Sequence, residues 1–278
     1  MKNKICFILI AISLLAFCLP GSCSDFPQRI ISLGPAITKQ LYLLGAEQRL
    51  IGVTTYCRYP AQAKEKEKVG TVLDINLEKI MQLQPDLVLA TSLTNQKDIR
   101  KLRSLGVRTV AFGRAKSFAE ICEHFLTLGR YLGKEKEAAT IINQAQVRVK
   151  IIKEKVREKE QLKVFIQVGA KPLITVSRDS FFNDLIEFAG GINVAGDALS
   201  GLYSREKVVK DNPDAIIITT MGITGDAEKT TWESFSSINA VKSGRIYIVD
   251  EYQYCSTSPL DFVQALVQMV QMLHPNDA

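Results

Sequence analysis

Histidine is scarce in this 278-residue sequence, which contains only His124 and His274. Zinc and manganese sites in proteins usually combine several histidines, or histidine with carboxylate ligands. His124 falls within a helical stretch that leads into the connecting region, and His274 lies near the C-terminus, so we expect both to be far from any strand end. The sequence therefore predicts no histidine-built metal site.

Motifs of the common enzyme classes are missing as well. No Gly-x-Gly-x-x-Gly follows the first predicted strand, and residues 222–226 lack the Gly-Lys-Ser/Thr ending of a phosphate-binding loop. The nucleophile elbow Gly-x-Ser-x-Gly does not occur, and neither histidine has the motif context of a general base. We therefore predict a binding protein without catalytic residues and without a cofactor of its own.

Cysteine is too sparse for a disulfide framework. Beyond residue 23 only Cys57, Cys122 and Cys255 remain, and an odd number allows one bridge at most. Cys122 belongs to the apolar stripe of a predicted helix, so we expect it in the core. The single tryptophan, Trp232, is expected to be a packing residue rather than a ligand platform.

Neither a basic stripe nor a long apolar run occurs in the body of the chain. The formal net charge is +6, but the 35 basic residues are scattered among 29 acidic ones, which argues against a nucleic-acid partner. No segment beyond the N-terminus reaches the ~18 uninterrupted apolar residues that a membrane span needs. With 46% hydrophobic residues, the chain can nevertheless bury a large core.

The N-terminus has the pattern of a secretory signal peptide. Lys2 and Lys4 precede an apolar run over residues 5–19, and a stretch of small residues follows. Cys23 is a candidate lipidation site, although Pro20 stands where a lipobox has a branched apolar residue. The alternative is ordinary cleavage after residue 24. We expect an extracytoplasmic protein, either periplasmic or anchored to the membrane as a lipoprotein through Cys23.

A phrase of fifteen residues occurs twice in the chain. Residues 77–91 and 205–219 share a Glu-Lys pair, a Pro-Asp pair and a final Thr in the same register. In each copy a polar cap, Asn76 or Ser204, precedes a short helix, and an apolar run typical of a buried parallel strand follows. The repeat predicts two lobes of similar build.

Strands and helices alternate in both halves, which is typical of a doubly wound α/β fold. The first half has predicted strands at 30–33, 50–53, 87–90 and 109–112 and helices at 35–44 and 96–105, besides the repeat helix. The second half has predicted strands at 164–168, 174–176, 215–219 and 246–249 and helices at 181–189 and 259–273.

A long helix is predicted to join the two lobes. Apolar residues recur every three or four positions between 138 and 156, with charged and amide residues on the other faces. One helix over 135–158 measures roughly 35 Å, and its single, brief stripe argues against a coiled coil. We predict a signal peptide at 1–24, a first lobe at 25–133, the spanning helix at 134–160 and a second lobe at 161–278. A helical connector should allow little hinge closure.

Five phrases in this order resemble the substrate-binding proteins of ABC importers for cobalamin and ferric siderophores. They cover nearly the whole mature chain and lie at 29–33, 52–60, 76–88, 180–193 and 244–247. The sequence departs from the family pattern at Lys39, where an acid is frequent, and at Arg58, where Asp is common. The resemblance implies two Rossmann-like lobes, each a mostly parallel sheet with flanking helices, with a ligand between them.

The resemblance also implies function. It points to a monomer that delivers a corrinoid or an iron chelate to a membrane permease, and the phrase 54–57 favours cobalamin. Arginines near the strand ends fit an anionic ferric siderophore or haem propionates instead. The rival from another class is an extracytoplasmic chelatase-like enzyme, which needs an acid or histidine in the cleft. Near the strand ends the sequence offers only Asp179 and Glu251 for that role.

Ligands of such sheets bind at the carboxyl ends of the strands, so we predict the binding residues there. The residues at these ends are aromatic, cationic, hydroxyl-bearing or thiol-bearing, and suit a wide, partly apolar ligand with a polar rim. The predicted ligand contacts are Tyr56, Cys57, Arg58, Ser92, Arg114, Arg178, Phe181, Tyr252, Tyr254 and Cys255. Cys57 and Cys255 would also suit a soft metal, a corrinoid cobalt or a disulfide across the cleft, but we favour simple wall residues.

Glu78 and Glu206 occupy equivalent places in the repeat, at about the second position of each helix. A carboxylate there interacts favourably with the helix dipole, which is worth about 0.3–1 kcal/mol and would explain both residues. The resemblance implies a second role, because these two positions in the family dock onto arginines of the permease. We expect the membrane to be reached only through that permease or through a lipid anchor.

Overall fold

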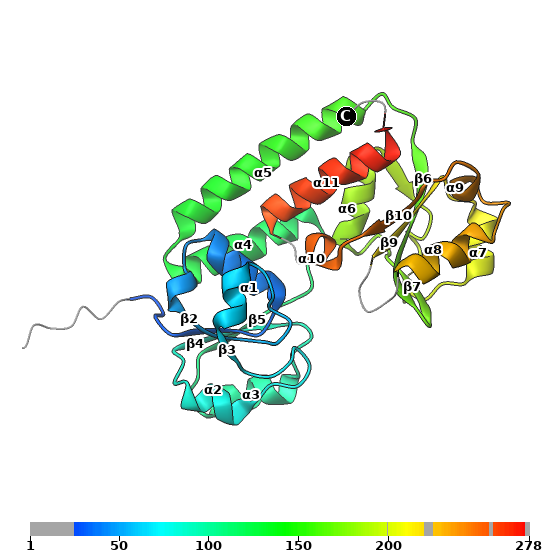
Figure 1. Ribbon diagram of the computed structural model, residues 1–278. Coiled ribbons are helices and arrows are strands. Elements are labelled where there is room, and N and C mark those ends of the chain that lie inside the picture. Colours follow the sequence, from blue (N-terminus) through cyan, green and yellow to red (C-terminus); the bar gives the residue numbers. More distant parts are fainter. Residues whose placement is uncertain (1–24, 199, 220–224, 256–257, 276–278) are drawn as a thin grey trace, which may run out of the picture.

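The computed structural model describes residues 25–198, 200–219, 225–255 and 258–275. The predicted signal peptide and the candidate lipidation site Cys23 lie outside the described residues. Two α/β lobes lie beside each other, and long helices run along one side of both (Figure 1). The predicted fold class is confirmed. Within the described ranges, every helix is too short or too polar to cross a membrane.

The first lobe is built on a five-stranded parallel sheet in the order β3-β2-β1-β4-β5. The strands are β1 (Ile30–Ser32), β2 (Leu50–Val53), β3 (Glu67–Lys68), β4 (Leu87–Thr91) and β5 (Thr109–Phe112). The connections contain α1 (Pro35–Leu43), η1 (Glu47–Arg49), η2 (Ala61–Glu65), α2 (Leu77–Gln82) and α3 (Gln96–Ser104). The predicted elements agree with these bounds to within one residue, whereas the sequence does not predict the two-residue strand β3 or the short helices η1 and η2.

The second lobe has a mixed sheet in the order β10-β9-β6-β7, with β8 pairing the start of β6. Its strands are β6 (Leu162–Ala170), β7 (Leu173–Thr175), β8 (Gly191–Asn193), β9 (Ala215–Thr219) and β10 (Ile246–Val249). Its helices are α6 (Phe181–Phe188), α7 (Arg205–Asp211), α8 (Gly225–Glu233), α9 (Asn239–Lys242), α10 (Glu251–Tyr254) and α11 (Pro259–Leu273). Only β7 is antiparallel among the described strands, and β6 is longer than predicted.

The repeated phrase occupies the same place in both lobes. Its apolar run forms β4 in the first lobe and β9 in the second, and each pairs in parallel with the central strand β1 or β6. The Pro-Asp pair has one structural role: the Asp86 carboxylate accepts from the backbone N–H of Arg29 at 3.1 Å, and Asp214 accepts from that of Lys163 at 2.9 Å. The duplicated aspartate therefore holds the start of the neighbouring strand in register.

Two helices join the lobes and share both hydrophobic cores. They are α4 (Phe118–Leu132) and α5 (Glu135–Val156), and α5 is the spanning helix that the sequence predicts. The N-terminal half of α4 packs in the core of the second lobe, and its C-terminal half packs in the core of the first. α11 lies along α5 and packs its Phe262 ring on Phe118 of α4, with the centroids 4.5 Å apart (Figure 1). The connection is a layer of three packed helices rather than the single helix expected.

Candidate functional site

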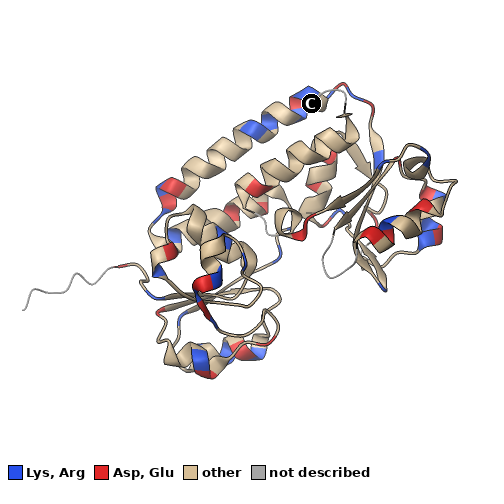
Figure 2. Cartoon of the chain, viewed as in Figure 1, with Lys and Arg blue, Asp and Glu red and all other residues tan. Residues whose placement is uncertain are grey.

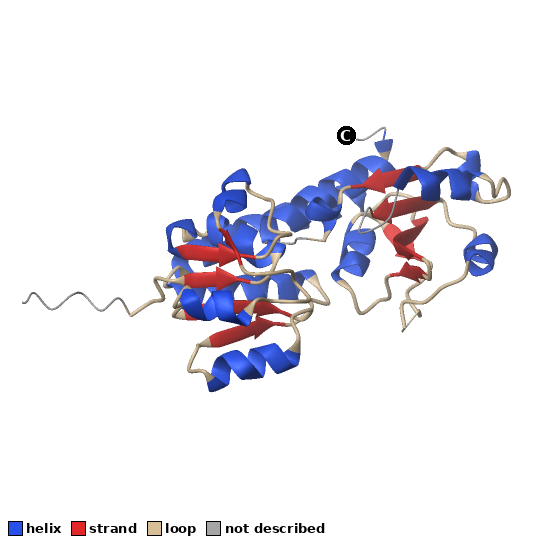
Figure 3. Ribbon diagram, turned by 60° about the horizontal axis from the view of Figure 1, so that its bottom comes forward, coloured by secondary structure: helices blue, strands red, loops and turns tan. Residues whose placement is uncertain are grey.

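The carboxyl ends of the first sheet point toward the second lobe (Figure 3). A cavity of about 560 Å³ lies at this edge, between the two lobes. Its lining is mostly apolar and comes from the loops after all five strands of the first sheet, from α1 and α4, and from α6 and α10 of the second lobe. The lining residues are Gly34, Pro35, Ala36, Ile37, Gln40, Tyr56, Val72, Thr91, Ser92, Leu93, Phe112, Gly113, Arg114, Ala115, Ile121, His124, Phe181, Glu251, Tyr252 and Cys255.

Close backbone approach shapes the first-lobe wall. A side chain at Gly34 would place its Cβ 2.4 Å from Cγ2 of Thr91, and both residues line the cavity. Glycine at this position lets α1 begin directly against the end of β4, with Pro35 as the first helical residue. This part of the cavity wall is therefore fixed by the packing of the Gly34 backbone, after β1, against the Thr91 side chain at the end of β4.

Direct contacts between the lobes border the cavity. The Tyr252 hydroxyl donates to the backbone oxygen of Tyr56 at 3.2 Å, and the Tyr59 ring meets the Tyr252 ring edge-on with centroids 5.0 Å apart. At the other side of the cavity, Arg114 Nη2 lies 3.5 Å from Ser180 Oγ. These contacts place the second-lobe residues of α6 and α10 opposite the first-lobe loops.

An ion pair fixes α1 to α11 beside the cavity. Lys39 Nζ donates to Asp261 Oδ1 at 2.6 Å, and the Asp261 carboxylate also accepts from Ser258 in the capping box of α11. Asp261 is only 4% exposed. Lys39, one of the two positions at which the sequence departs from the family pattern, thus forms an ion pair with a buried carboxylate of the other lobe.

Six of the ten predicted contacts line this cavity. They are Tyr56, Ser92, Arg114, Phe181, Tyr252 and Cys255, and they come from five separate segments of the chain. Arg114 supplies a positive charge and Glu251 a negative one to the described wall. Burial raises the pKa of the Cys255 thiol to about 12, so the thiol is protonated at neutral pH.

Two predicted contacts are buried in the core instead. Cys57 is 1% exposed, and its sulfur lies 3.2 Å from the hydroxyls of both Thr38 and Thr54. Tyr254 has no exposed surface, and its hydroxyl donates to the backbone oxygen of Ala265 at 3.4 Å. Both side chains turn inward from segments whose neighbours face the cavity, which the linear sequence does not reveal.

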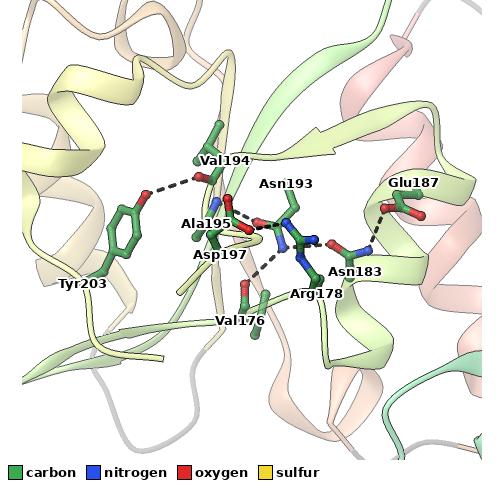
Figure 4. A network of polar contacts seen from close by, with 9 residues as sticks. All are labelled: Val176, Arg178, Asn183, Glu187, Asn193, Val194, Ala195, Asp197 and Tyr203. Atoms are coloured by element: carbon green, nitrogen blue, oxygen red, sulfur yellow. Dashed lines mark hydrogen bonds and ion pairs between the residues drawn. The ribbon is translucent and has the colours of Figure 1, made fainter. Parts of the chain in front are cut away.

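Two predicted arginines are exposed but lie outside the described cavity wall. Arg58 follows the buried Cys57 and points to solvent. Arg178 forms an ion pair with Asp197 of the second lobe (Figure 4). Beside that pair, Asn193 Nδ2 donates to the backbone oxygen of Val176 and to Asn183 Oδ1, each at 3.1 Å. Arg178 therefore holds the segment before α6 to the loop after β8, where its backbone N–H also donates to the Gly196 oxygen at 2.9 Å.

The alternative of a disulfide between Cys57 and Cys255, which the sequence left open, is not found, because Cys57, Cys122 and Cys255 are free thiols. Cys122 is buried in the core of the second lobe, as predicted. Across the ranges that the structure describes, no group of three or more His, Cys, Asp or Glu side chains is placed to hold a metal ion.

The expectation for His124 is also wrong. His124 lies in the cavity wall one helical turn after Ile121, and its ring meets the Phe112 ring at the end of β5 with centroids 5.9 Å apart. The sequence signal was available, because Ile121 and His124 share one face of the helix. The sequence does not show, however, that this face of the helix lies against the end of β5.

Glu78 and Glu206 are both exposed at the second position of short helices, α2 and α7. The caps are as predicted: Asn76 accepts from the Lys79 N–H, and Ser204 accepts from the Lys207 N–H. The pKa of Glu206 is lowered by backbone and Ser204 hydrogen bonds. Figure 2 shows both signs of charge on these helices and on their neighbours α3 and α8.

A buried polar network lies beneath α7. Arg205, next to Glu206, donates to Glu228 of α8 at 2.7 Å and stacks 4.6 Å above the Trp232 ring. Gln167 of β6 donates to Glu228 and accepts from the Trp232 indole N–H at 2.6 Å. Trp232 has no exposed surface and is the packing residue that the sequence predicts. Through these contacts, α7 is fixed to the sheet and to α8.

Comparisons with known proteins agree with this architecture. A family model described as "Periplasmic binding protein" matches residues 30–253. An "Uncharacterized ABC transporter substrate-binding lipoprotein YvrC" from Bacillus subtilis is 33% identical over 258 residues, which cover 90% of this chain and 81% of that protein. A "Vitamin B12-binding protein" from Vibrio campbellii is 30% identical over 237 residues, covering 84% of each. The crystal structure of a possible iron-binding (periplasmic solute-binding) protein from Staphylococcus epidermidis has a TM-score of 0.78 and 30% identity, covering 89% of this chain and 99% of that one.

Proposed function

Since the chain belongs to the periplasmic binding protein family, we propose that it carries a corrinoid or an iron chelate in the cavity between its lobes and delivers it to the permease of an ABC importer. The observation that supports this most strongly is the cavity itself. It lies at the carboxyl ends of the strands, opens between two lobes and has a wide, mostly apolar wall with aromatic rings. The protein then acts by binding and release, without catalysis.

The cavity chemistry bears on the ligand. The rings of Tyr56, Phe112, Phe181 and Tyr252 offer faces and edges for a flat macrocycle, and Arg114 offers a cation for a carboxylate or phosphate on its rim. A corrinoid is favoured by the vitamin B12-binding relative, and an iron chelate by the iron-binding structural neighbour. Only Arg114 of the three predicted arginines lines the described wall, which weakens the case for a ligand with several anionic groups.

Titration of the purified protein tests this proposal. Cyanocobalamin, haemin and a ferric hydroxamate are added separately, and absorbance and calorimetry record binding. We expect one of the first two to bind at a single site with micromolar or tighter affinity. Weaker binding of the same chelate by the Tyr56→Ala variant would locate the site at the cavity wall that Tyr56 forms. Failure of all three chelates to bind would contradict the proposed ligand class.

An enzymatic alternative has a specific observation behind it. His124 and Glu251 both line the cavity, and a chelatase-like enzyme needs such groups to move protons. Incubation of the protein with protoporphyrin and ferrous or cobaltous ion, followed by absorbance, measures metal insertion directly. We expect no rate above that of buffer, and turnover would favour the enzyme.

We further propose that Glu78 and Glu206 dock the two lobes onto permease arginines. Both carboxylates are exposed, and the repeat places them at equivalent points of α2 and α7. The predicted division into lobes at 25–133 and 161–278 with a spanning helix at 134–160, and a monomeric state, belong to the same proposal. Acylation of Cys23 is the proposed anchor, and mass spectrometry of the mature N-terminus distinguishes it from cleavage after residue 24.

A further inference from the structure

The imidazole of His124 faces the cavity between the lobes. The side chain is half-buried and lines the wall between α4 and the end of β5. Neither ring nitrogen has a hydrogen-bond partner among the described residues, whereas His274 bonds the backbone oxygen of Ala189 at 3.2 Å. The Phe112 ring, 5.9 Å away, limits the orientations of the imidazole and leaves its nitrogens free for a ligand.

A free imidazole in an apolar wall can ligate a metal, but one imidazole alone cannot hold a bare metal ion. Neutral imidazole nitrogen binds iron, cobalt, copper and zinc readily. A bare ion, however, needs three or four protein donors, and the described residues hold no such group. The Cys255 thiol lines the same cavity, but it is protonated at neutral pH. His124 can therefore bind a metal only if the metal arrives with its other ligands.

We propose that His124 supplies an axial nitrogen ligand to the metal of a planar metallo-macrocycle held in the cavity. The inference rests on the proposed function and narrows its ligand class to tetrapyrrole chelates with an exchangeable axial position. Such a chelate brings four equatorial nitrogens, so one protein donor completes its coordination on one face. Ile121 and Phe112 line the cavity beside His124, so their apolar side chains would pack against that face of the chelate.

The proposal separates chelates by their coordination chemistry. Haemin and diaquacobinamide have axial positions that imidazole can occupy. Cyanocobalamin has both axial positions filled, and a ferric hydroxamate has all six positions filled. The first two should therefore bind with a change in their absorbance spectra that reports nitrogen ligation. The last two should bind, if at all, without such a change.

The experiment compares the unchanged protein with His124→Gln, His124→Ala and the control His274→Gln. Each is titrated with haemin, diaquacobinamide and cyanocobalamin, and absorbance and electron paramagnetic resonance spectra are recorded. For haemin or diaquacobinamide, we expect both His124 variants to lose the nitrogen-ligated spectrum and to bind about 10-fold or more weakly. The control should keep both properties. Free imidazole added to the His124→Ala complex should restore the spectrum.

Two outcomes would overturn the inference and can be told apart. If haemin or diaquacobinamide binds His124→Gln and His124→Ala with the unchanged spectrum and affinity, the axial role is wrong while the transport proposal stands. If no chelate binds the unchanged protein, the proposed function fails together with the inference. Circular dichroism of each variant shows whether the fold is intact, and the two substitutions differ enough in size to separate packing effects from loss of the nitrogen.

Discussion

Glu228, beneath α7, makes a part of the protein's stability depend on pH. Burial acts to raise the pKa of Glu228, but hydrogen bonds from Arg205 and Gln167 outweigh it and hold the pKa below its ordinary value. A carboxyl whose pKa is lowered in the folded state adds stability above its unfolded pKa, and this stability is lost as pH falls through the folded pKa. The ion pair with Arg205 should therefore weaken in mild acid.

Glu228→Gln should make the protein less stable at neutral pH by about 1–3 kcal/mol, because Arg205 loses its charged partner. Between about pH 5 and about pH 3, the free energy of unfolding should fall less steeply for the variant than for the unchanged protein. Urea denaturation across this range measures both effects. Glu233→Gln on the same helix, which is exposed, serves as the control. Equal acid sensitivity of the Glu228 variant and the unchanged protein would contradict the role of the pair.

Tyr56 is the residue through which the first-lobe wall should contact ligand. Its ring is half exposed in the cavity, while its backbone oxygen receives the Tyr252 hydroxyl. Tyr56→Ala keeps that backbone contact and removes the ring, so it should weaken chelate binding by roughly 1–3 kcal/mol and leave stability nearly unchanged. Calorimetry measures the affinity. Tyr131→Ala, which alters a ring outside the described cavity wall, should bind normally, and normal binding by Tyr56→Ala would remove it from the site.

At the scale of elements, the two repeat helices form a matched pair. If Glu78 and Glu206 only interact with the dipoles of α2 and α7, reversing their charge should affect stability slightly and transport not at all. If they meet arginines across an interface, loss of each charged partner commonly costs about 2 kcal/mol or more of binding. We predict that Glu78→Arg with Glu206→Arg keeps fold and ligand affinity but fails to stimulate ATP hydrolysis by the reconstituted importer.

The control for that variant has the same charge change at a different surface. Glu158→Arg with Glu160→Arg alters two exposed acids just beyond α5, far in sequence from either repeat helix. This control should stimulate the importer normally. Stimulation by the Glu78 and Glu206 variant at the level of the control would leave only the dipole explanation.

The sequence predicts the elements better than the site. A polar cap and a closing glycine predict a helix to within a residue or two, as for α3 with Asn95 and Gly106 and for α6 with Ser180 and Gly190. The sequence does not predict the short strands β3 and β8, because two or three residues carry no periodic signal. The positions of Cys57 and Tyr254 after strands predict wall residues, but both side chains are buried, because the local backbone conformation after each strand decides which side chain faces inward. His124 was missed because its helix meets the end of β5 only in three dimensions.

At the scale of the whole molecule, three helices should restrict relative motion of the lobes. α4 and α5 each contribute to both cores, α11 packs against both of these helices, and Lys39 pairs with Asp261 between the lobes. We predict that small-angle scattering profiles recorded with and without a bound chelate superpose. A marked fall in the radius of gyration on binding would indicate hinge closure of the kind found when lobes are joined by extended strands.

The stacking of Phe262 on Phe118 has a consequence for synthesis and export. The two rings are 4.5 Å apart in the folded protein, but one belongs to the helix that closes the first lobe and the other to the last helix of the chain. Until that last helix emerges, the Phe118 end of α4 lacks the part of its apolar cover that α11 provides. A nascent chain halted before Pro259 should therefore expose apolar surface, tend to aggregate, depend on chaperones and be sensitive to proteases, even though the first sheet is already complete.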